Sequence, residues 1–403
     1  MLKRNFHTVF ILMLVCFFTS HDGYSQTATV EKVKKAASGM KLRGIGPAFM
    51  GGRIADIAID KSDFSTWYIA VGSGGVWKTT NSGITFKPIF DDQVSYSIGT
   101  VSIDPNNPET VWVGTGENVS GRHVAWGDGV YKSVNGGTSW ESMGLSTSEH
   151  IGKILIDPRN SDVVFVAAEG PLWSSGGERG LYRSVDGGKT WDLTLQIDEN
   201  TGVTDVEFDP SNPDVLYAAA YQRRRQTWSL LAGGPKSGIY KSVDNGASWN
   251  KISLGLPKGD MGKIGLAVTP ADPNLVYATI EANGDEKGFY RSMDKGESWE
   301  KRNSYISGGT GPHYYQEIEV SNTDPDLIYQ MDVFYRVSRD GGKTFGILGN
   351  GREKHSDNHA LWIDPNNGKH LISGTDGGLY ESFDEGTTWR HFPNLPISQF
   401  YKL

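Results

Sequence analysis

Short runs of hydrophobic and aromatic residues, broken by turn-forming residues, follow one another along most of this chain. The runs Val76–Lys78, Val130–Lys132 and Ile239–Lys241 each combine an aliphatic residue, an aromatic residue and lysine. This composition is typical of a short, half-buried β-strand. No segment carries a sustained apolar period of 3.6 residues, and the best candidate is the short stretch 30–37. The pattern predicts an all-β protein.

An eight-residue motif follows each of these strands, and we call it the octad. It reads Ser/Thr, any residue, Asp/Asn, any residue, Gly, any residue, Ser/Thr, aromatic, and it occurs seven times, about every 50 residues. The octads occupy residues 79–86, 133–140, 184–191, 242–249, 292–299, 338–345 and 382–389. Their third positions are Asn81, Asn135, Asp186, Asp244, Asp294, Asp340 and Asp384.

Two further strand-like runs precede each octad strand and are separated by a turn. In one unit the turn 104–108 precedes Val111–Val113, and in another the turn 209–213 precedes Val215–Tyr217. Both turns begin with Asp-Pro, in which proline fixes φ and aspartate caps the turn. With the run that follows the octad, each unit is predicted to hold four strands.

Seven four-stranded units of about 50 residues predict a seven-bladed β-propeller of antiparallel blades. Ring closure explains how 403 residues form one body, although a single core usually stops growing at about 250–300 residues. An open solenoid is the alternative, but it would need polar caps at its ends, and the sequence shows none.

The octad is expected to be structural. Its Asp or Asn oxygen can accept backbone N–H bonds, its Gly can adopt positive φ, and its aromatic ring can bury against the neighbouring strands. A motif present once in every blade cannot converge on one active site. Function is therefore expected where the repeats differ.

Composition and charge narrow the function classes. The chain has 51 glycines and 11% aromatic residues, which suits many tight turns between strands. Its net charge of −8 argues against a general nucleic-acid binder. The one cysteine, Cys16, lies near the N-terminus, so the rest of the chain has no disulfide, no cysteine nucleophile and no thiolate metal site. We expect no cofactor.

The first 25 residues are predicted to be a secretory signal. Lys3 and Arg4 precede the apolar run Val9–Phe18, and small residues follow near Ser25. The run is shorter than the roughly 20 residues that span a bilayer, so a membrane anchor is the weaker interpretation. Residues 26–39 are then a linker and residues 40–395 the propeller. The exported protein would be periplasmic, surface-bound or secreted, with no membrane span after cleavage.

The octads and the sequence around them resemble the Asp-box, or bacterial neuraminidase repeat, and the exported bacterial propellers of the sortilin-type and glycosyl-hydrolase-like families. Supporting stretches are Ile45–Ile54, Tyr221–Arg225, Gly233–Pro235 and Asp357–Trp362. The resemblance implies a propeller that binds or cleaves glycans or, as in sortilins, binds peptides. It also implies a second propeller, so residues 396–403 are predicted to begin a further repeat in a longer chain.

Two departures from the resembling enzymes argue against catalysis by this chain alone. The sialidases use an Arg-Ile-Pro motif and an arginine triad, whereas Arg53-Ile54 is followed here by Ala55. In the xyloglucan-cleaving enzymes, catalytic aspartates lie in strand-loop motifs of two facing propellers, and residues 70–75 of this chain contain no Asp.

Three irregular insertions, 117–129, 169–180 and 221–238, are predicted to cluster at one mouth of the ring together with segments of the sixth and seventh units. Aromatic rings stack on sugar faces, and a carboxylate pair can supply acid and base. Weak catalytic candidates are Glu117, Glu169, Glu317 and Asp357. Ligand-binding candidates are Arg122, His123, Trp126, Trp173, Arg223, Arg225, Trp228, Tyr314 and Tyr315.

Two clusters of polar residues in these segments have simpler interpretations. Of Arg223-Arg224-Arg225 at most two can serve one ligand, because strand alternation turns the middle one away, and loop anchoring is the favoured role. His355, Asp357 and His359 would share one face of a strand and suit a divalent metal, but a polar plug of the channel is favoured over a metal site.

The sequence thus predicts an exported propeller that acts as a ligand-binding module, with a glycan as the expected ligand. A glycoside hydrolase of the Asp-box type is the first alternative and a sortilin-like protein or peptide binder the second.

Overall fold

The computed structural model describes residues 51–308, 311–315, 317–349 and 351–398, together with the isolated residues 32, 35, 36 and 38. The chain divides into two units, residues 1–46 and 47–403, and the second contains all the strands. The predicted signal peptide and residues 399–403 lie outside the described residues. Among the described residues, no helix is long and apolar enough to cross a membrane.

Seven antiparallel sheets, each called a blade, follow one another along the chain. Blade 1 consists of β1 (Ile54–Ile59), β2 (Trp67–Val71), β3 (Gly75–Thr79) and β4 (Lys87–Pro88), and blade 2 of β5 (Ile98–Asp104), β6 (Asn107–Thr115), β7 (Val130–Ser133) and β8 (Glu141–Ser142). Blade 3 consists of β9 (Ile151–Asp157), β10 (Asn160–Ala168), β11 (Gly180–Ser184) and β12 (Asp192–Leu195). Blade 4 consists of β13 (Thr201–Asp209), β14 (Asn212–Arg225), β16 (Gly238–Ser242) and β17 (Asn250–Lys251), with β15 (Leu230–Ala232) paired to β14.

The last three blades repeat this order. Blade 5 consists of β18 (Met261–Val268), β19 (Val276–Ala282), β20 (Gly288–Ser292) and β21 (Glu300–Asn303), with a 3-10 turn η1 (Gly284–Glu286) between β19 and β20. Blade 6 consists of β22 (Ile318–Val320), β23 (Ile328–Gln330), β24 (Arg336–Ser338) and β25 (Gly346–Ile347), and blade 7 of β26 (Asn358–Ile363), β27 (Leu371–Thr375), β28 (Gly378–Ser382) and β29 (Arg390–His391).

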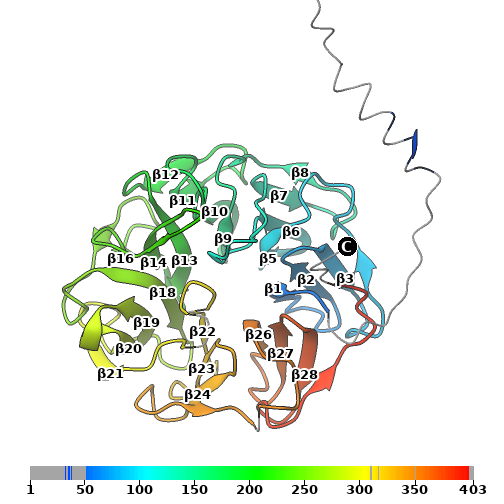
Figure 1. Cartoon of the computed structure of the whole chain (residues 1–403). Helices are drawn as coiled ribbons and strands as arrows, with labels where there is room; N and C mark the ends of the chain where they lie inside the picture. The colour runs from blue at the N-terminus through cyan, green and yellow to red at the C-terminus, as the bar shows by residue number, and fades with distance from the viewer. Residues whose placement is uncertain are drawn as a thin grey trace, which may run out of the picture. The chain divides into compact units, whose positions relative to one another are not determined.

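The blades stand around a central axis, with the first strand of each blade innermost (Figure 1). This confirms the predicted all-β, seven-bladed propeller of four-stranded antiparallel blades. The propeller differs from the prediction in blade 4, where residues 221–225 were expected in an irregular insertion. They continue β14 as a regular strand, because Arg223, Arg224 and Arg225 pair with β15 across a hairpin.

Hydrophobic clusters between neighbouring blades hold the ring together. Tyr68 and Ala70 of blade 1 pack in one cluster with Val101 and Val111 of blade 2. The last blade joins the first in the same way, since Ile372 packs with Ile54 and Ile69. Among the described strands, none is shared between blades 7 and 1, and buried apolar area joins these two blades.

The octads form the turns between the third and fourth strands, and in all seven the first hydroxyl donates to the side-chain oxygen of the Asp or Asn. In blade 4 the Ser242 hydroxyl donates to Asp244 Oδ1 over 2.7 Å and accepts from Gly246 N over 2.9 Å, while Ser248 N donates to Asp244 Oδ1 over 2.9 Å. Gly246 has φ +76°, and a Cβ there would lie 2.3 Å from the Phe165 ring of blade 3. The motif therefore needs glycine at this position for both conformation and space.

The octad aromatic residues connect each turn to the preceding blade. Trp140 Nε1 donates to Ile89 O over 2.7 Å, and Trp191 Nε1 donates to Met143 O over 2.7 Å. The octads thus stabilise both a turn and a junction between blades.

Candidate functional site

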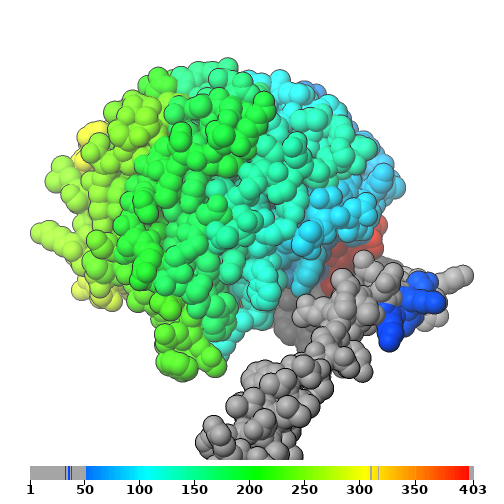
Figure 2. Space-filling model, turned by 90° about the horizontal axis from the view of Figure 1, so that it is seen from above, coloured from blue at the N-terminus to red at the C-terminus, as the bar shows by residue number. Residues whose placement is uncertain are grey.

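The loops between second and third strands and the connectors between blades lie at the ends of the strands opposite to the octads, because neighbouring strands are antiparallel. We call this face the mouth. It carries the loops 116–129 and 169–179, the β14–β15 hairpin, the connector to β22 and the connector to β26. In the edge-on view of Figure 2, green and cyan parts of the ring project beyond the rest on one side.

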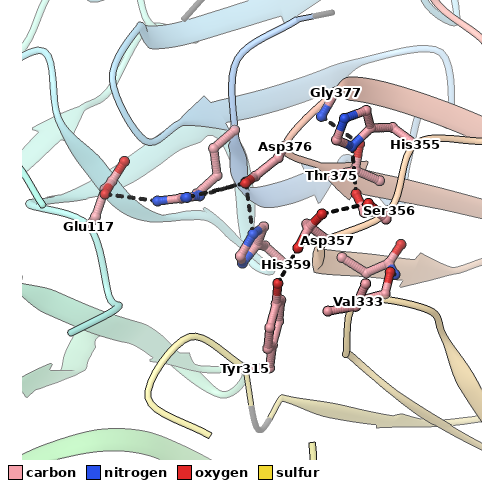
Figure 3. A network of polar contacts seen from close by, with 12 residues as sticks. Glu117, Tyr315, Val333, His355, Ser356, Asp357, His359, Thr375, Asp376 and Gly377 are labelled. Carbon is pink, nitrogen blue, oxygen red and sulfur yellow. Dashed lines mark hydrogen bonds and ion pairs between the residues drawn. The ribbon is translucent and has the colours of Figure 1, made fainter. Parts of the chain in front are cut away.

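Arg53, just before β1, lies at the centre of a charged network at the mouth. Its Nη1 is 3.2 Å from Glu117 Oε2, and its Nε donates to Asp376 Oδ1 over 2.7 Å. His359 Nε2 lies 2.9 Å from the same Asp376 oxygen. Burial opposes a charge on Arg53, but Asp376 and Glu117 outweigh it and raise the pKa of the guanidinium. The network links blades 1, 2 and 7 (Figure 3).

Asp376 is held as a carboxylate. Burial would raise its pKa, but the contacts with His359 and Arg53 together hold that pKa well below the usual range of an aspartate. An acid of this kind stays ionised at neutral pH and cannot donate a proton to a leaving group.

Glu117 occupies the space beside the turn of blade 1 that lacks the expected aspartate. A Cβ added to Gly72 would lie 2.3 Å from Glu117 Oε1, so only glycine fits there next to this carboxylate. Glu117 is buried, and its Oε1 also lies 3.4 Å from the Ser73 hydroxyl. The carboxylate of the candidate Glu117 is therefore enclosed by Arg53 on one side and by the turn Gly72-Ser73 on the other.

Tyr315 and Asp357 form a second contact pair next to this network. The Tyr315 hydroxyl donates to Asp357 Oδ1 over 2.5 Å, and the Tyr315 ring stacks on His359 at 5.3 Å between centroids. Ser356 Oγ donates to Asp357 Oδ2 over 2.5 Å. Tyr315 is buried, so its ring supports His359 rather than offering a free face.

The expectation that His355, Asp357 and His359 share one face of a strand is wrong. Strand β26 begins only at Asn358, and Asp357 has φ +62°, which turns the chain at that residue. His355 Nδ1 instead lies 2.7 Å from Ser356 O. In the described part of the chain, no group of three or more His, Cys, Asp or Glu residues has the arrangement to hold a metal ion.

Glu169 and Arg223 form an ion pair that is sealed from solvent. Arg223 Nη1 lies 2.7 Å from Glu169 Oε2, and each side chain is 1% exposed. The pKa of Glu169 is raised to about 7. Burial is the largest cause and the charge of Glu317 adds to it, while Arg223 and Lys263 oppose the rise. Arg223 also donates to Ser120 Oγ over 3.1 Å. These two candidates hold the loops of blades 2, 3 and 4 together and are out of reach of a ligand in this arrangement.

Glu317 pairs with Lys263 at the cavity of the central channel, where Lys263 Nζ lies 2.8 Å from Glu317 Oε1. The channel contains a cavity of about 120 Å³ that is lined by charged residues of several inner strands. Lys153 contacts Asp205 over 3.0 Å and also Glu207, and Glu319 lines the same cavity. Burial raises the pKa of Glu319 to about 8, and the neighbouring carboxylates Glu207 and Asp205 add to the effect of burial while Lys153 opposes it.

Tyr314 is the central aromatic residue of the mouth. Its ring lies 5.9 Å from the guanidinium carbon of Arg53, and His123 stacks against it at 6.4 Å. A Cβ on Gly121 would lie 2.5 Å from the Tyr314 hydroxyl, so the loop of blade 2 rests directly on this residue. The structure thus brings together the candidates His123 and Tyr314, which the sequence separates by 191 positions.

The remaining candidates at the mouth are exposed rings and two arginines. Trp126, Trp173 and Trp228 are 70%, 42% and 80% exposed, on the loops of blades 2, 3 and 4. Arg122 is exposed, and Arg225 is buried with its Nε donating to Ser120 O over 2.8 Å. The predicted ligand candidates therefore separate into three buried residues, Arg223, Arg225 and Tyr315, and the more exposed residues of the mouth.

Sequence reasoning missed Arg53 and Asp376 as partners at the mouth. Arg53 was noted only for lacking the proline of the sialidase motif, and Asp376 lies in a Thr-Asp-Gly-Gly turn that resembles many others in the chain. Only ring closure brings blade 7 beside blade 1, so no local signal distinguished them.

Sequence relatives of this chain include xyloglucanases. One from Acetivibrio thermocellus is 24% identical over 224 residues, which covers 49% of this chain and 25% of that protein. One from a Paenibacillus species is 27% identical over 237 residues, covering 52% and 22%. This chain therefore matches about a quarter of the length of these relatives. They belong to the enzyme class, glycoside hydrolases, that the sequence predicted in case the chain is an enzyme.

Solved structures share the fold. A GH74 xyloglucanase from Xanthomonas campestris superposes with a TM-score of 0.62 at 17% identity, covering 87% of this chain and 55% of that one. YCF48 from Cyanidioschyzon merolae superposes with a TM-score of 0.54 at 15% identity, covering 83% and 97%. No family model matches the chain, so the resemblance to Asp-box and sortilin-type proteins stays a prediction.

Proposed function

We propose that the mouth of this propeller binds a glycan and does not cleave it. The observation that carries the proposal is the exposure of Trp126 and Trp228, at 70% and 80%, on mouth loops of blades 2 and 4. Large aromatic rings left in water mark binding surfaces, and flat rings suit the faces of sugars. The similarity to xyloglucanases supports a glycan as the ligand.

The carboxylates at the mouth argue against hydrolysis. Glycoside hydrolysis requires two carboxyl groups about 5–10 Å apart that both reach the bond, one of them protonated. Glu117 and Glu169 are buried against arginines, and Asp357 is hydrogen-bonded to Tyr315 and Ser356. Glu169 has a pKa suited to an acid, about 7, but it is sealed inside the loops.

The hydrolase alternative rests on Glu317, which is partly exposed and has one carboxylate oxygen without a hydrogen bond in the described part of the chain. Its partner would have to be Asp357 or a carboxylate of a second propeller. Export through the predicted signal would bring either activity to polysaccharides outside the cytoplasm.

The test is retention of the mature chain in native gels that contain xyloglucan, with an assay of reducing ends on the same samples. We expect retention without new reducing ends, and loss of retention in Trp126→Ala and Trp228→Ala. Phe383→Ala is the matched control, because Phe383 is an exposed aromatic residue of the blade 7 octad, on the opposite face.

Other outcomes identify the alternatives. Release of reducing ends that disappears in Glu317→Gln or Asp357→Asn would establish a hydrolase. Retention of peptides but of no glycan would establish a peptide binder, and equal retention of Trp228→Ala and the wild type would remove the mouth as the binding surface.

A further inference from the structure

Arg225 is a buried cation without an acidic partner. Its side chain is 7% exposed, and its one side-chain hydrogen bond runs from Nε to Ser120 O over 2.8 Å. Among the described residues, no carboxylate lies within 4.0 Å of Arg225 or of Arg122. Burial and the charge of Arg122 both lower the pKa of Arg225. An uncompensated buried charge is costly, so its presence calls for a counter-ion from elsewhere.

Two other arginines of the mouth, Arg53 and Arg223, have acidic partners. Arg53 contacts the carboxylates Glu117 and Asp376, and Arg223 contacts Glu169. Arg223 and Arg225 lie two positions apart on β14 and are both buried, yet only one of them has an acidic partner. In the described part of the chain, the two terminal nitrogens of Arg225 make no hydrogen bond or ion pair, and they are not among the fully buried polar atoms that lack a partner.

Three segments of the chain surround Arg225. Ser120, which accepts its Nε, donates its own N–H to His313 O over 3.0 Å, and Gly121 rests on the Tyr314 hydroxyl. Burial, together with the charges of Arg225 and Lys263, lowers the pKa of His313 to about 4. His313 is therefore neutral at pH 7 and does not add to the repulsion.

The charges on the two sides of Tyr314 differ. The tyrosine interacts with Arg53, Glu117 and Asp376, whose charges largely offset one another, and also with Arg225. The side that holds Arg225 and Arg122 has two cations, and no acid of the described residues is in ion-pair contact with either of them. This side of the mouth is positive although the whole chain carries a net charge of −8.

We propose that Arg225 and Arg122, with the Tyr314 hydroxyl beside them, bind an anionic group of the glycan: the carboxylate of a uronic acid or a sulfate ester. The proposal rests on the glycan-binding function above and specifies the ligand as acidic. Guanidinium groups recognise carboxylate and sulfate oxygens through pairs of charge-assisted hydrogen bonds.

The placement of the tryptophans supports an acidic sugar rather than a free ion. Trp126 follows Arg122 by four residues in the loop of blade 2, and Trp228 follows Arg225 by three in the hairpin of blade 4. Each of the two mouth segments thus offers one cation and one exposed ring. A glycan with acidic substituents presents both matching features, a flat face for a ring and an anion for an arginine.

The experiment compares four polysaccharides in affinity gels: polygalacturonate, its fully methyl-esterified form, a sulfated galactan and xyloglucan. We expect retention by polygalacturonate, by the sulfated galactan, or by both, at low ionic strength, with much weaker retention by the methyl ester. The two acidic probes distinguish a carboxylate from a sulfate. Losing the charge-assisted bonds of one arginine should weaken acidic binding roughly tenfold.

The variants are Arg122→Gln and Arg225→Gln, with Lys189→Gln as the matched control, an exposed cation on the octad face. Among the described residues, the Arg122 side chain makes no hydrogen bond or ion pair, so Arg122→Gln should keep the wild-type melting temperature and bind acidic polymers about tenfold more weakly. Lys189→Gln should leave the retention of all four polysaccharides unchanged.

Three results would overturn the inference. If xyloglucan and the methyl ester are retained at least as well as the acidic polymers, the ligand is neutral and only the proposed function stands. If acidic polymers are retained equally by the wild type and both variants, the anion binds elsewhere. If none of the four is retained, the glycan-binding function itself fails.

Discussion

The octad face and the mouth use polar groups in opposite ways. In every octad the serine or threonine and the aspartate or asparagine bond to atoms two to four residues away, as Ser242 does with Asp244 and Gly246. At the mouth, Arg53 bonds to residues 64 and 323 positions away, and Arg225 to one 105 positions away. One face is a set of local turns, and the other is built only when the ring closes.

This difference shows where change is tolerated. The Ser or Thr and the Asp or Asn of each octad are satisfied within their own turn, so these hydrogen bonds do not depend on another blade. The mouth residues depend on partners from other blades. The charge of Arg53 is compensated by carboxylates of blades 2 and 7, whereas Arg225 has no acidic partner among the described residues. A fold with a repetitive face and an irregular face separates stability from recognition.

The largest effect is expected from the mouth network. Arg53→Met leaves the buried Glu117 and the partly buried Asp376 without their cation, which should lower the free energy of unfolding by about 3–5 kcal/mol. Urea unfolding measures it. The double variant Arg53→Met/Glu117→Gln should recover part of the loss, because it removes the unpaired buried charge. A loss below about 1 kcal/mol would show that the Arg53 network contributes no more to stability than an exposed surface ion pair does.

The channel between the two faces should respond to pH. Glu319 has a pKa of about 8 in the folded chain, above the value near 4.3 of an unfolded one, so the folded state holds its proton more tightly. Stability should therefore fall as pH rises from about 5 to 8, by at most about 1.4 kcal/mol per pH unit. Glu319→Gln should flatten this dependence in urea unfolding at several pH values. An unchanged slope in the variant would show that Glu319 ionises normally.

A single octad should contribute less. Ser242→Ala removes the buried hydroxyl that accepts from Gly246 N and donates to Asp244, and should cost about 1–3 kcal/mol. Asp244→Ala should cost less, since Asp244 is exposed and water can replace it. Thermal melts of Ser242→Ala and Ser292→Ala should agree closely, because the two turns make the same bonds. Loss of ligand retention at an unchanged melting temperature would contradict the structural role.

The smallest effect on stability is expected from the exposed rings. Trp228→Ala should change the free energy of unfolding by less than about 0.5 kcal/mol, because its side chain makes little contact with the fold. Its effect should appear in glycan retention. A large drop in melting temperature would mean that Trp228 packs against the protein in solution, and the comparison of the two faces would then lose its clearest case.

The blade architecture followed from local patterns, whereas the arrangement of the mouth did not. Strand alternation on β14 correctly predicted that Arg224 points to the opposite side from Arg223 and Arg225. It predicted the same surroundings for Arg223 and Arg225. Their difference comes from Glu169 of blade 3, which reaches only Arg223. The spacing of His355, Asp357 and His359 suggested a shared strand face, but the positive φ of Asp357 ended that regularity.

The sequence by itself determined the number of blades, the four strands in each and the octad turns, because each depends on residues within a few positions of one another. The tertiary structure decided which charges meet: that Asp376 and Glu117 compensate Arg53, that Glu169 is sealed against Arg223, and that Arg225 keeps no acid. The physical reason is that ion pairing depends on distance in space, and in a ring the last blade lies next to the first.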